Sequence, residues 1–470
     1  MEKKVRYALS MCSHWKYIKY WGMVALVVIV CACLGFYIKA RQDYFALAPA
    51  PSGLTKTTAT EPLSYSPILA WNKDSESVYY EIEFFAEKPM FLSATAESDK
   101  AIFRSYAIFQ NHYNAPLQSF ATDLLGKQPL YWRVRGMDLD GKPYTPFSEL
   151  AVLWTSGDKE GMGDPEPLTD YNNGNGSVLL YPVYHWIPMT GMVRYELQIY
   201  EGNPLTDKDA KLIDTFHTDV AELYDANPRY SNRDFYWRVR ATDEKDVPTS
   251  RWSLPKRFRT APTDRWEVGV LGDSISHGGG HYSYGPEDFE FSWLRYLNFP
   301  AINLSESGDT IQMTVKRFNQ DVLPFQPKYL LILTGTNSLR GGEDPKVVIE
   351  GLKEIQQRCR ENNIRPILLT LPDVNPDNIA HVFHEPTADD WTERFQEVNA
   401  YIRTQVHIDT AAAFPRLDGV LPTSFAMDGL HPDVSGKKLM GAKVNSSWDE
   451  VKKQADEEME KYEEEKEGLN

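Results

Sequence analysis

Three residue types that can together hydrolyse an ester occur in this sequence at positions from which they can meet. Ser274 follows the short apolar run Val268 to Gly272, and Asp428-Gly429-Leu430-His431 lies near the other end of the chain. A serine hydroxyl becomes a nucleophile when a histidine accepts its proton and a carboxylate orients that histidine. The spacing of Asp428 and His431 on a glycine-containing loop lets the carboxylate reach the imidazole. We therefore predict Ser274 as nucleophile, His431 as base and Asp428 as the orienting group.

The apolar run before Ser274 is expected to be a buried strand, because it is short, β-branched and bounded by turn residues. Gly272 permits a sharp turn at its end, which is the edge where open α/β sheets place their sites. From about residue 265 the pattern alternates between strands and helices, which predicts a parallel sheet. We expect strands near 266–271, 300–304, 328–334, 365–371 and 406–410, and helices near 310–320, 346–362, 388–404 and 435–447.

Four short blocks in this region resemble those of the SGNH or GDSL serine esterases and lipases. They are Gly272-Asp273-Ser274, Gly308, Gly335-Thr336-Asn337, and the pair Asp428 and His431, in the family's order. The resemblance covers residues 265–448 and implies a three-layer α/β fold (SGNH hydrolase, flavodoxin-like). It also implies an oxyanion hole made by the backbone N–H groups of Ser274 and Gly308 and by the side chain of Asn337.

Other residues near these blocks have competing interpretations. Asp273 is expected to brace its loop, because adjacent side chains diverge and it cannot easily reach a histidine beside Ser274. His277, His281 and His384 are candidate substrate-contacting residues on loops. Three glycines separate His277 from His281 and disfavour the helix that would pair them as metal ligands, so we expect no metal. The region lacks a dinucleotide-binding Gly-x-Gly-x-x-Gly, and we expect no cofactor.

An internal repeat precedes this region, at residues 62–158 and 172–261. The segment Tyr-Trp-Arg-Val-Arg occurs at 131–135 and again at 236–240. Both copies are aromatic and alternating without a helical pattern, and they resemble tandem fibronectin type III-like β-sandwiches. In the repeated strand we expect Trp132 and Val134 to point inward, and Arg133 and Arg135 to lie on a solvated face. Contact with polysaccharide through an exposed aromatic face is an alternative role for the repeats.

The N-terminal segment predicts a membrane anchor. Residues 1–20 are basic, and residues 21–38 are apolar and uncharged. As a helix this run is long enough to cross the hydrocarbon layer, and the basic flank predicts a cytoplasmic N-terminus. We expect a single-pass signal anchor that holds the following domains outside the cytoplasm, at a bacterial cell surface or in the periplasm. A cleaved signal peptide and a lipoprotein site at Cys33 are alternatives.

The remaining features limit the classes of partner. Residues 39–61 are expected to be a linker, and the acidic residues 449–470 an exposed helix or a solvated tail. The net charge of −16 argues against binding to nucleic acid, which needs clustered Lys and Arg. Cys359 is the one cysteine after residue 33, so the bulk of the chain cannot form an internal disulfide.

These features predict a membrane-anchored extracytoplasmic serine esterase with the two repeats as a stalk. The family resemblance implies hydrolysis of oxygen esters through an acyl-enzyme. Since family members often remove acetyl groups from carbohydrates, an acylated carbohydrate or another small ester is the expected substrate. A lipid hydrolase of the lysophospholipase or thioesterase kind is an alternative, as is a non-catalytic anchored binding protein.

Overall fold

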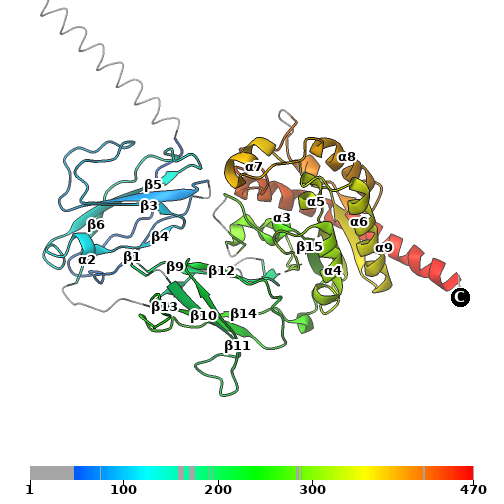
Figure 1. Ribbon diagram of the computed structural model, residues 1–470, viewed down its shortest axis with the longest axis horizontal. Helices are drawn as coiled ribbons and strands as arrows, with labels where there is room; N and C mark the ends of the chain where they lie inside the picture. Colours follow the sequence, from blue (N-terminus) through cyan, green and yellow to red (C-terminus); the bar gives the residue numbers. More distant parts are fainter. Residues whose placement is uncertain are drawn as a thin grey trace, which may run out of the picture.

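The computed structural model describes residues 47–74, 76–156, 164–168, 175–189, 191–192, 194–281, 285–286, 288–415 and 419–468. The expected membrane span at 21–38 and its alternatives lie outside these ranges. Within them, no helix is both long and apolar enough to cross a membrane. Figure 1 shows three parts, which we call repeat 1 (residues 47–156), repeat 2 (residues 164–261) and the α/β domain (residues 262–468).

The two repeats share a strand arrangement as well as a sequence pattern. The larger antiparallel sheet has the order β3-β2-β5-β6 in repeat 1 and β11-β10-β13-β14 in repeat 2, so corresponding strands occupy corresponding places. Smaller sheets, β1-β4 and β12-β9-β7, complete the two repeats. The N-terminal part is thus rich in strands as expected, and its likeness to fibronectin type III domains stays a prediction. The bounds are β1 Ile68–Ala70, β2 Tyr79–Phe85, β3 Phe103–Ile108, β4 His112–Asn114, α2 Leu117–Phe120, β5 Leu130–Met137 and β6 Ala151–Leu153 in repeat 1, and β7 Glu166–Pro167, β9 Val183–Ile187, β10 Arg194–Glu201, β11 Lys211–Thr218, β12 Glu222–Tyr224, β13 Phe235–Thr242 and β14 Lys256–Phe258 in repeat 2.

The expectation that Arg133 and Arg135 lie on a solvated face is wrong. Trp132 and Val134 do point into the core, but Arg133 and Arg135 are also buried, with 2% and 5% exposed. Arg133 donates to the carbonyl of Ser93, in the segment that follows β2, and its guanidinium lies 3.8 Å from the ring centre of Phe147. The alternation in the sequence predicts on which face of the strand each side chain lies. It does not show that a distant loop covers the face on which Arg133 and Arg135 lie.

The α/β domain is built on a parallel sheet with the strand order β19-β18-β17-β15-β16-β8. All five predicted strands are confirmed: β15 Val268–Gly272, β16 Ile302–Asn303, β17 Tyr329–Leu333, β18 Arg365–Leu369 and β19 His407–Ile408. From β15 the chain goes first to β16 on one side and then to β17 on the other. This reversal is a topological switch point, where the loops after neighbouring strands separate and leave a crevice at the carboxyl edge.

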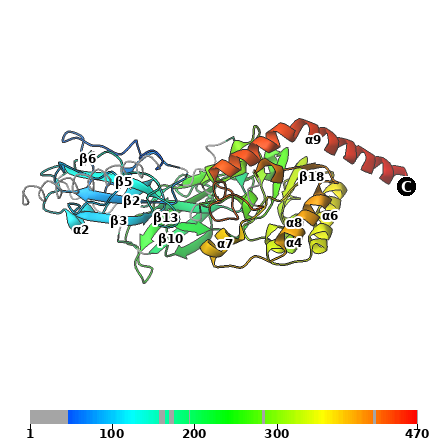
Figure 2. The same cartoon turned by 90° about the horizontal axis from the view of Figure 1, so that it is seen from above.

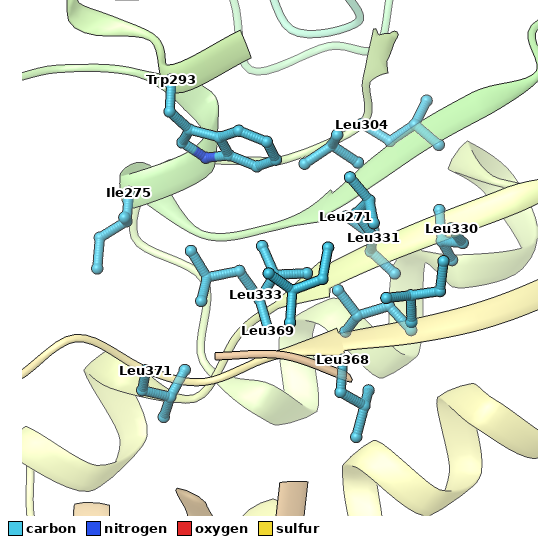
Figure 3. Packing of buried hydrophobic residues seen from close by; sticks show 14 of the residues in the cluster. Leu271, Ile275, Trp293, Leu304, Leu330, Leu331, Leu333, Leu368, Leu369 and Leu371 are labelled. Atoms are coloured by element: carbon cyan, nitrogen blue, oxygen red, sulfur yellow. The ribbon is translucent and has the colours of Figure 1, made fainter. Parts of the chain in front are cut away.

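Helices cover the two faces of this sheet. The helix α6 packs against both α4 and α8, and Figure 2 shows α9 on the opposite side of the domain. Between the layers lies a core rich in leucine, part of which Figure 3 shows around Leu271, Leu331 and Leu369. Cys359 is buried in this core as a free thiol. The helices are α3 Ser274–His277, α4 Ile311–Asp321, α5 Thr336–Arg340, α6 Pro345–Glu361, α7 Pro376–Phe383, α8 Trp391–Ile402 and α9 Val434–Gly468, with short 3-10 helices at η2 Pro262–Asp264, η3 Phe289–Phe291, η4 Trp293–Tyr296 and η5 Ala411–Ala413.

Two elements depart from the expected domain boundaries. The strand β8 (Val178–Leu179) falls in the sequence of repeat 2, yet it pairs in parallel with β16 at the edge of the α/β sheet. The helix α9 continues from the α/β domain through the acidic tail, and Val451, Ala455 and Met459 of that tail are buried. The first part of the tail is therefore a packed helix, because one apolar stripe runs between its charged residues.

Candidate active site

Ser274 is the first residue of α3, directly after β15, and its position depends on Gly272. A Cβ atom at residue 272 would lie 2.1 Å from the carbonyl oxygen of Leu333 on β17, so only glycine allows the two strands to approach here. Asp273 caps α3, since its Oδ1 accepts from the N–H of Ile275 at 3.1 Å. The Asp273 carboxylate therefore braces the turn that presents Ser274, as expected.

The structure brings the predicted nucleophile, base and orienting group together. His431 Nε2 lies 2.9 Å from Ser274 Oγ, and His431 Nδ1 lies 2.8 Å from Asp428 Oδ2. The second carboxylate oxygen of Asp428 accepts from the N–H groups of Leu430 and His431 at 2.8 and 2.7 Å. These contacts hold the loop in the shape that points the imidazole at Ser274.

Electrostatics fixes the direction of this chain of hydrogen bonds. Burial alone would raise the pKa of Asp428, but the charge of His431 and the hydrogen bonds from His431 and Leu430 hold it below its ordinary value. An ionised carboxylate only accepts, so Nδ1 of His431 must carry the proton that it donates. In the neutral imidazole Nε2 then accepts from the Ser274 hydroxyl, which is the arrangement a general base requires.

Gly308 and Asn337 border the same cavity as Ser274 and His431. Gly308 has a φ of 89°, a left-handed conformation that favours glycine. Asn337 Nδ2 donates to the carbonyl of Asp309 at 3.0 Å, and Asn337 Oδ1 accepts from Arg340 Nε at 3.2 Å. These two contacts orient the amide and leave a second N–H on Nδ2, so Asn337 is able to donate to a bound oxygen.

The cavity itself has a volume of about 390 Å³, and most of its lining residues are glycines or carry polar side chains. Its apolar side chains are few, namely Pro286, Phe383 and Leu430. Repeat 2 contributes one lining residue, Glu222, so the stalk that we expected also forms part of the wall. The complete lining is Glu222, Ser274, Gly278, Gly279, Gly280, Gly285, Pro286, Ser307, Gly308, Asn337, Arg340, Phe383, Glu385, Asp428, Leu430 and His431.

None of the three candidate substrate-contacting histidines lines this cavity. His277 is fully buried, and burial lowers its pKa to about 4, so it is neutral. Its Nε2 donates to the carbonyl of Tyr181, which leaves Nδ1 to accept from Ser307 Oγ at 2.7 Å. His281 is also buried and lies 3.2 Å from Asp433, while His384 is exposed at the end of α7 beside the lining residues Phe383 and Glu385. The glycines between His277 and His281 form the wall instead.

Two buried cations behind the site were missed in the sequence. Arg317 on α4 donates to the carbonyl of Gly272 at 2.8 Å and to Asp309 at 2.6 Å, and so ties the end of β15 to the loop that carries Gly308. Lys437 on α9 donates to the carbonyl of Ile275 at 2.7 Å, and burial lowers its pKa to about 7. In the sequence, each of the two is a basic residue within a predicted amphipathic helix, and such residues more often face solvent.

The model of the GDSL-like Lipase/Acylhydrolase family matches residues 270–439, from β15 into α9. We call these matched residues the GDSL-like hydrolase domain. The match lies within the region in which we recognised the four blocks and supports an ester-bond hydrolase. Among the described residues, no group of three or more His, Cys, Asp or Glu side chains is arranged to hold a metal ion.

Curated relatives are similar to about a quarter of this chain. The uncharacterized lipoprotein YqeF of Bacillus subtilis (strain 168) is 30% identical over 137 residues, which are 25% of this chain and 54% of that protein. Thioesterase 1/protease 1/lysophospholipase L1 of Escherichia coli (strain K12) is 29% identical over 131 residues, 26% of this chain and 60% of that one. The chain thus spans little more than half the length of these relatives.

Solved structures are similar to about two fifths of this chain. The lipase/acylhydrolase from Enterococcus faecalis is 23% identical, with 38% of this chain and 94% of that chain covered and a TM-score of 0.31. A GDSL-like lipase from Bacteroides thetaiotaomicron VPI-5482 is 18% identical, with 41% and 90% covered and a TM-score of 0.32.

Proposed function

We propose that the protein is a serine esterase that hydrolyses oxygen esters of short acyl groups, above all acetyl groups, on carbohydrate or other cell-surface polymers. The observation that carries the proposal is the contact of 2.9 Å between Ser274 Oγ and His431 Nε2, in a cavity that Gly308 and Asn337 also line. The small number of apolar side chains in the wall favours a small acyl group over a long chain.

The first half of the reaction forms an acyl-enzyme. Ser274 Oγ attacks the ester carbonyl carbon while its proton moves to His431 Nε2, and Asp428 stabilises the resulting imidazolium. The oxyanion accepts hydrogen bonds from the N–H groups of Ser274 and Gly308 and from Asn337 Nδ2. Loss of one such donor typically costs on the order of 10²–10³ in rate. The tetrahedral intermediate collapses as the ester C–O bond breaks, and the leaving alkoxide takes the proton from His431.

The second half releases the acid. Water loses a proton to His431 Nε2 and attacks the acyl carbon through the same oxyanion site. The bond from the acyl carbon to Ser274 Oγ then breaks, and Oγ recovers the proton. Because His431 acts once as base and once as acid in each half, no other titratable group has to move a proton.

The test is hydrolysis of p-nitrophenyl esters from acetate to octanoate by residues 43–470, beside the Ser274→Ala variant. We expect turnover that requires Ser274 and falls as the acyl chain lengthens. Turnover that rises with chain length would instead favour a lipid hydrolase, the class suggested by the name of the Escherichia coli relative. Folded protein with no turnover on any ester would favour the non-catalytic binding protein.

We further infer that residues 21–38 anchor the protein in a membrane, with its N-terminus in the cytoplasm and the α/β domain outside. The length and apolar character of this run and its basic flank support the inference. The lipoprotein name of the Bacillus subtilis relative keeps lipidation at Cys33 as the alternative. Alkaline phosphatase fused after residue 43 should be active, and the mature protein should retain residues 21–38 in its peptide map. A chain that begins at Cys33 would identify a lipoprotein.

A further inference from the structure

A second cavity, of about 460 Å³, lies between the two repeats. Its walls come from β3 and β4 of repeat 1 and from the segments around β9 and β12 of repeat 2. The volume falls within the range of about 300–1,000 Å³ that ligand pockets usually have. Since both repeats supply its walls, the cavity exists only where the two repeats meet.

The two cavities meet at one residue, Glu222 on β12, which lines both of them. Glu222 is half-buried, and burial raises its pKa. Two residues further along, Tyr224 places its ring 5.6 Å from the ring of His277, so β12 is seated against the α/β domain. The two cavities are therefore neighbours that share Glu222 as part of their walls.

The lining of the second cavity combines aromatic faces with hydrogen-bonding side chains. Tyr106 and Phe109 are large aromatic residues with 52% and 44% of their surface exposed. Gln110 and Asn114 contribute amide side chains to the same wall, and His185 and Glu222 contribute further groups that can form hydrogen bonds.

This combination selects among ligand classes. An occupant that carries hydroxyl groups can form hydrogen bonds with these side chains and is therefore favoured over a hydrocarbon chain. Exposed aromatic rings favour an occupant with flat apolar faces. Sugar rings have both properties, because their hydroxyl groups point outward around the rim and their C–H groups lie on the faces.

We propose that the cavity between the repeats is a subsite for saccharide units of a polymer whose ester group reaches Ser274. The assignment rests on the proposed esterase function for its substrate, but not for the binding itself. In this arrangement the polymer lies on Tyr106 and Phe109, passes Glu222 and enters the catalytic cavity. The repeats then select the polymer, and the GDSL-like hydrolase domain removes its acyl groups.

The first measurement is binding to the full chain carrying Ser274→Ala. The probes are hexasaccharides of xylose, N-acetylglucosamine and mannuronic acid without O-acetyl groups, titrated by calorimetry. We expect at least one to bind, and Tyr106→Ala or Phe109→Ala to weaken that binding about tenfold, the effect of losing one well-packed aromatic contact. Phe91→Ala is the matched control, because Phe91 is an aromatic residue of repeat 1 that is 80% exposed and lines neither cavity.

The second measurement uses the full chain with active Ser274 and compares two substrates. The ratio of kcat/KM for the O-acetylated hexasaccharide to kcat/KM for p-nitrophenyl acetate should fall about tenfold in Tyr106→Ala and Phe109→Ala and stay constant in Phe91→Ala. Absence of binding for all three saccharides, or an unchanged ratio in both aromatic variants, would overturn the subsite. Saccharide binding without any Ser274-dependent hydrolysis would support the subsite and contradict the esterase function, so the two failures are distinguishable.

Discussion

Asp428 has two separate tasks at the candidate site, and they fall to its two oxygens. Oδ2 accepts from the imidazole of His431, while Oδ1 accepts from the backbone N–H groups of Leu430 and His431. Replacement by alanine removes both sets of contacts at once. Replacement by asparagine preserves an acceptor for the backbone and changes only what faces the imidazole.

We expect Asp428→Asn to keep the fold and lose about 10⁴-fold in kcat on p-nitrophenyl acetate. The asparagine amide that faces Nδ1 favours the tautomer with the proton on Nε2, which cannot accept from Ser274. Ser274→Ala and His431→Ala should lose more, because the nucleophile or the base is absent. Initial rates of the three variants beside the wild type are the measurement, and wild-type activity in Asp428→Asn would rule out the role assigned to Asp428.

A second prediction at the residue scale concerns Asp273 and the dependence of stability on pH. Asp273 is fully buried, and burial raises its pKa to about 6, against the effects of the N–H of Ile275 and the charges of His431 and Lys437. The folded protein therefore binds a proton more tightly than the unfolded chain. The contribution of Asp273 to stability is greatest below about pH 4 and is lost as the pH rises towards 6.

Asp273→Asn removes this titration but retains an oxygen that can cap α3. The thermal midpoint of the variant, measured relative to the wild type, should rise between pH 4 and pH 7. The shift of roughly two pH units corresponds to about 3 kcal/mol across that window. Asp207→Asn, on an exposed turn of repeat 2, is the control. A difference between Asp273→Asn and wild type that stays constant with pH would show that Asp273 is already ionised at pH 4.

At the scale of elements, the features that could be predicted from the sequence are those that depend on local patterns. Apolar runs bounded by turn residues located the five strands from β15 to β19, and the four blocks located Ser274, Asp428 and His431. The strand β8 was missed because two apolar residues, Val178 and Leu179, carry no periodic signal, and their pairing with β16 depends on residues more than 120 positions away. The buried histidines were misplaced for a related reason, since glycine-rich loops do not reveal which side chains turn inward.

The acidic composition of the second half of helix α9 does not reveal that this half packs against the α/β domain. Its acidic half contains ten acidic residues, yet Val451, Ala455 and Met459 face the domain. Asp456 also accepts from the hydroxyl of Tyr329 at 2.7 Å and from Arg365 Nε at 3.0 Å. The acidic half therefore stabilises the first residues of β17 and β18, and it is not simply a solvated tail.

Truncation of α9 tests this role. A chain ending at Trp448 loses the buried stripe and the contacts of Asp456, and its thermal midpoint should fall by more than about 5 °C. A chain ending at Tyr462 keeps them and should unfold within about 2 °C of the full chain, because the residues removed are largely exposed. Equal midpoints for the two truncated chains would mean that the acidic half contributes nothing to stability.

At the scale of the whole molecule, the repeats are joined to the α/β domain on the side of the candidate site. Repeat 2 contributes β8 to the sheet and Glu222 to the catalytic cavity. Repeat 1 reaches the domain at Lys73, which pairs with Asp288 and lies 2.7 Å from Glu290, and at Asp140, which lies 3.0 Å from His381 on α7. Figure 1 shows repeat 1 beside α7, which is a different arrangement from a simple extended stalk.

Reversal of the charge at Lys73 tests whether these contacts fix the arrangement of the molecule. Lys73 is 18% exposed and lies 5.0 Å from the ring centre of Phe291, so Lys73→Glu places a partly desolvated carboxylate beside Asp288 and Glu290. We expect repeat 1 to separate from the α/β domain, with a larger radius of gyration by small-angle X-ray scattering. Lys88→Glu, on an exposed loop of the same repeat, makes the same charge change as a control. An unchanged radius of gyration would show that other contacts hold repeat 1 in place. Since Tyr106 and Phe109 belong to repeat 1, its separation should also lower activity on an acetylated hexasaccharide relative to p-nitrophenyl acetate.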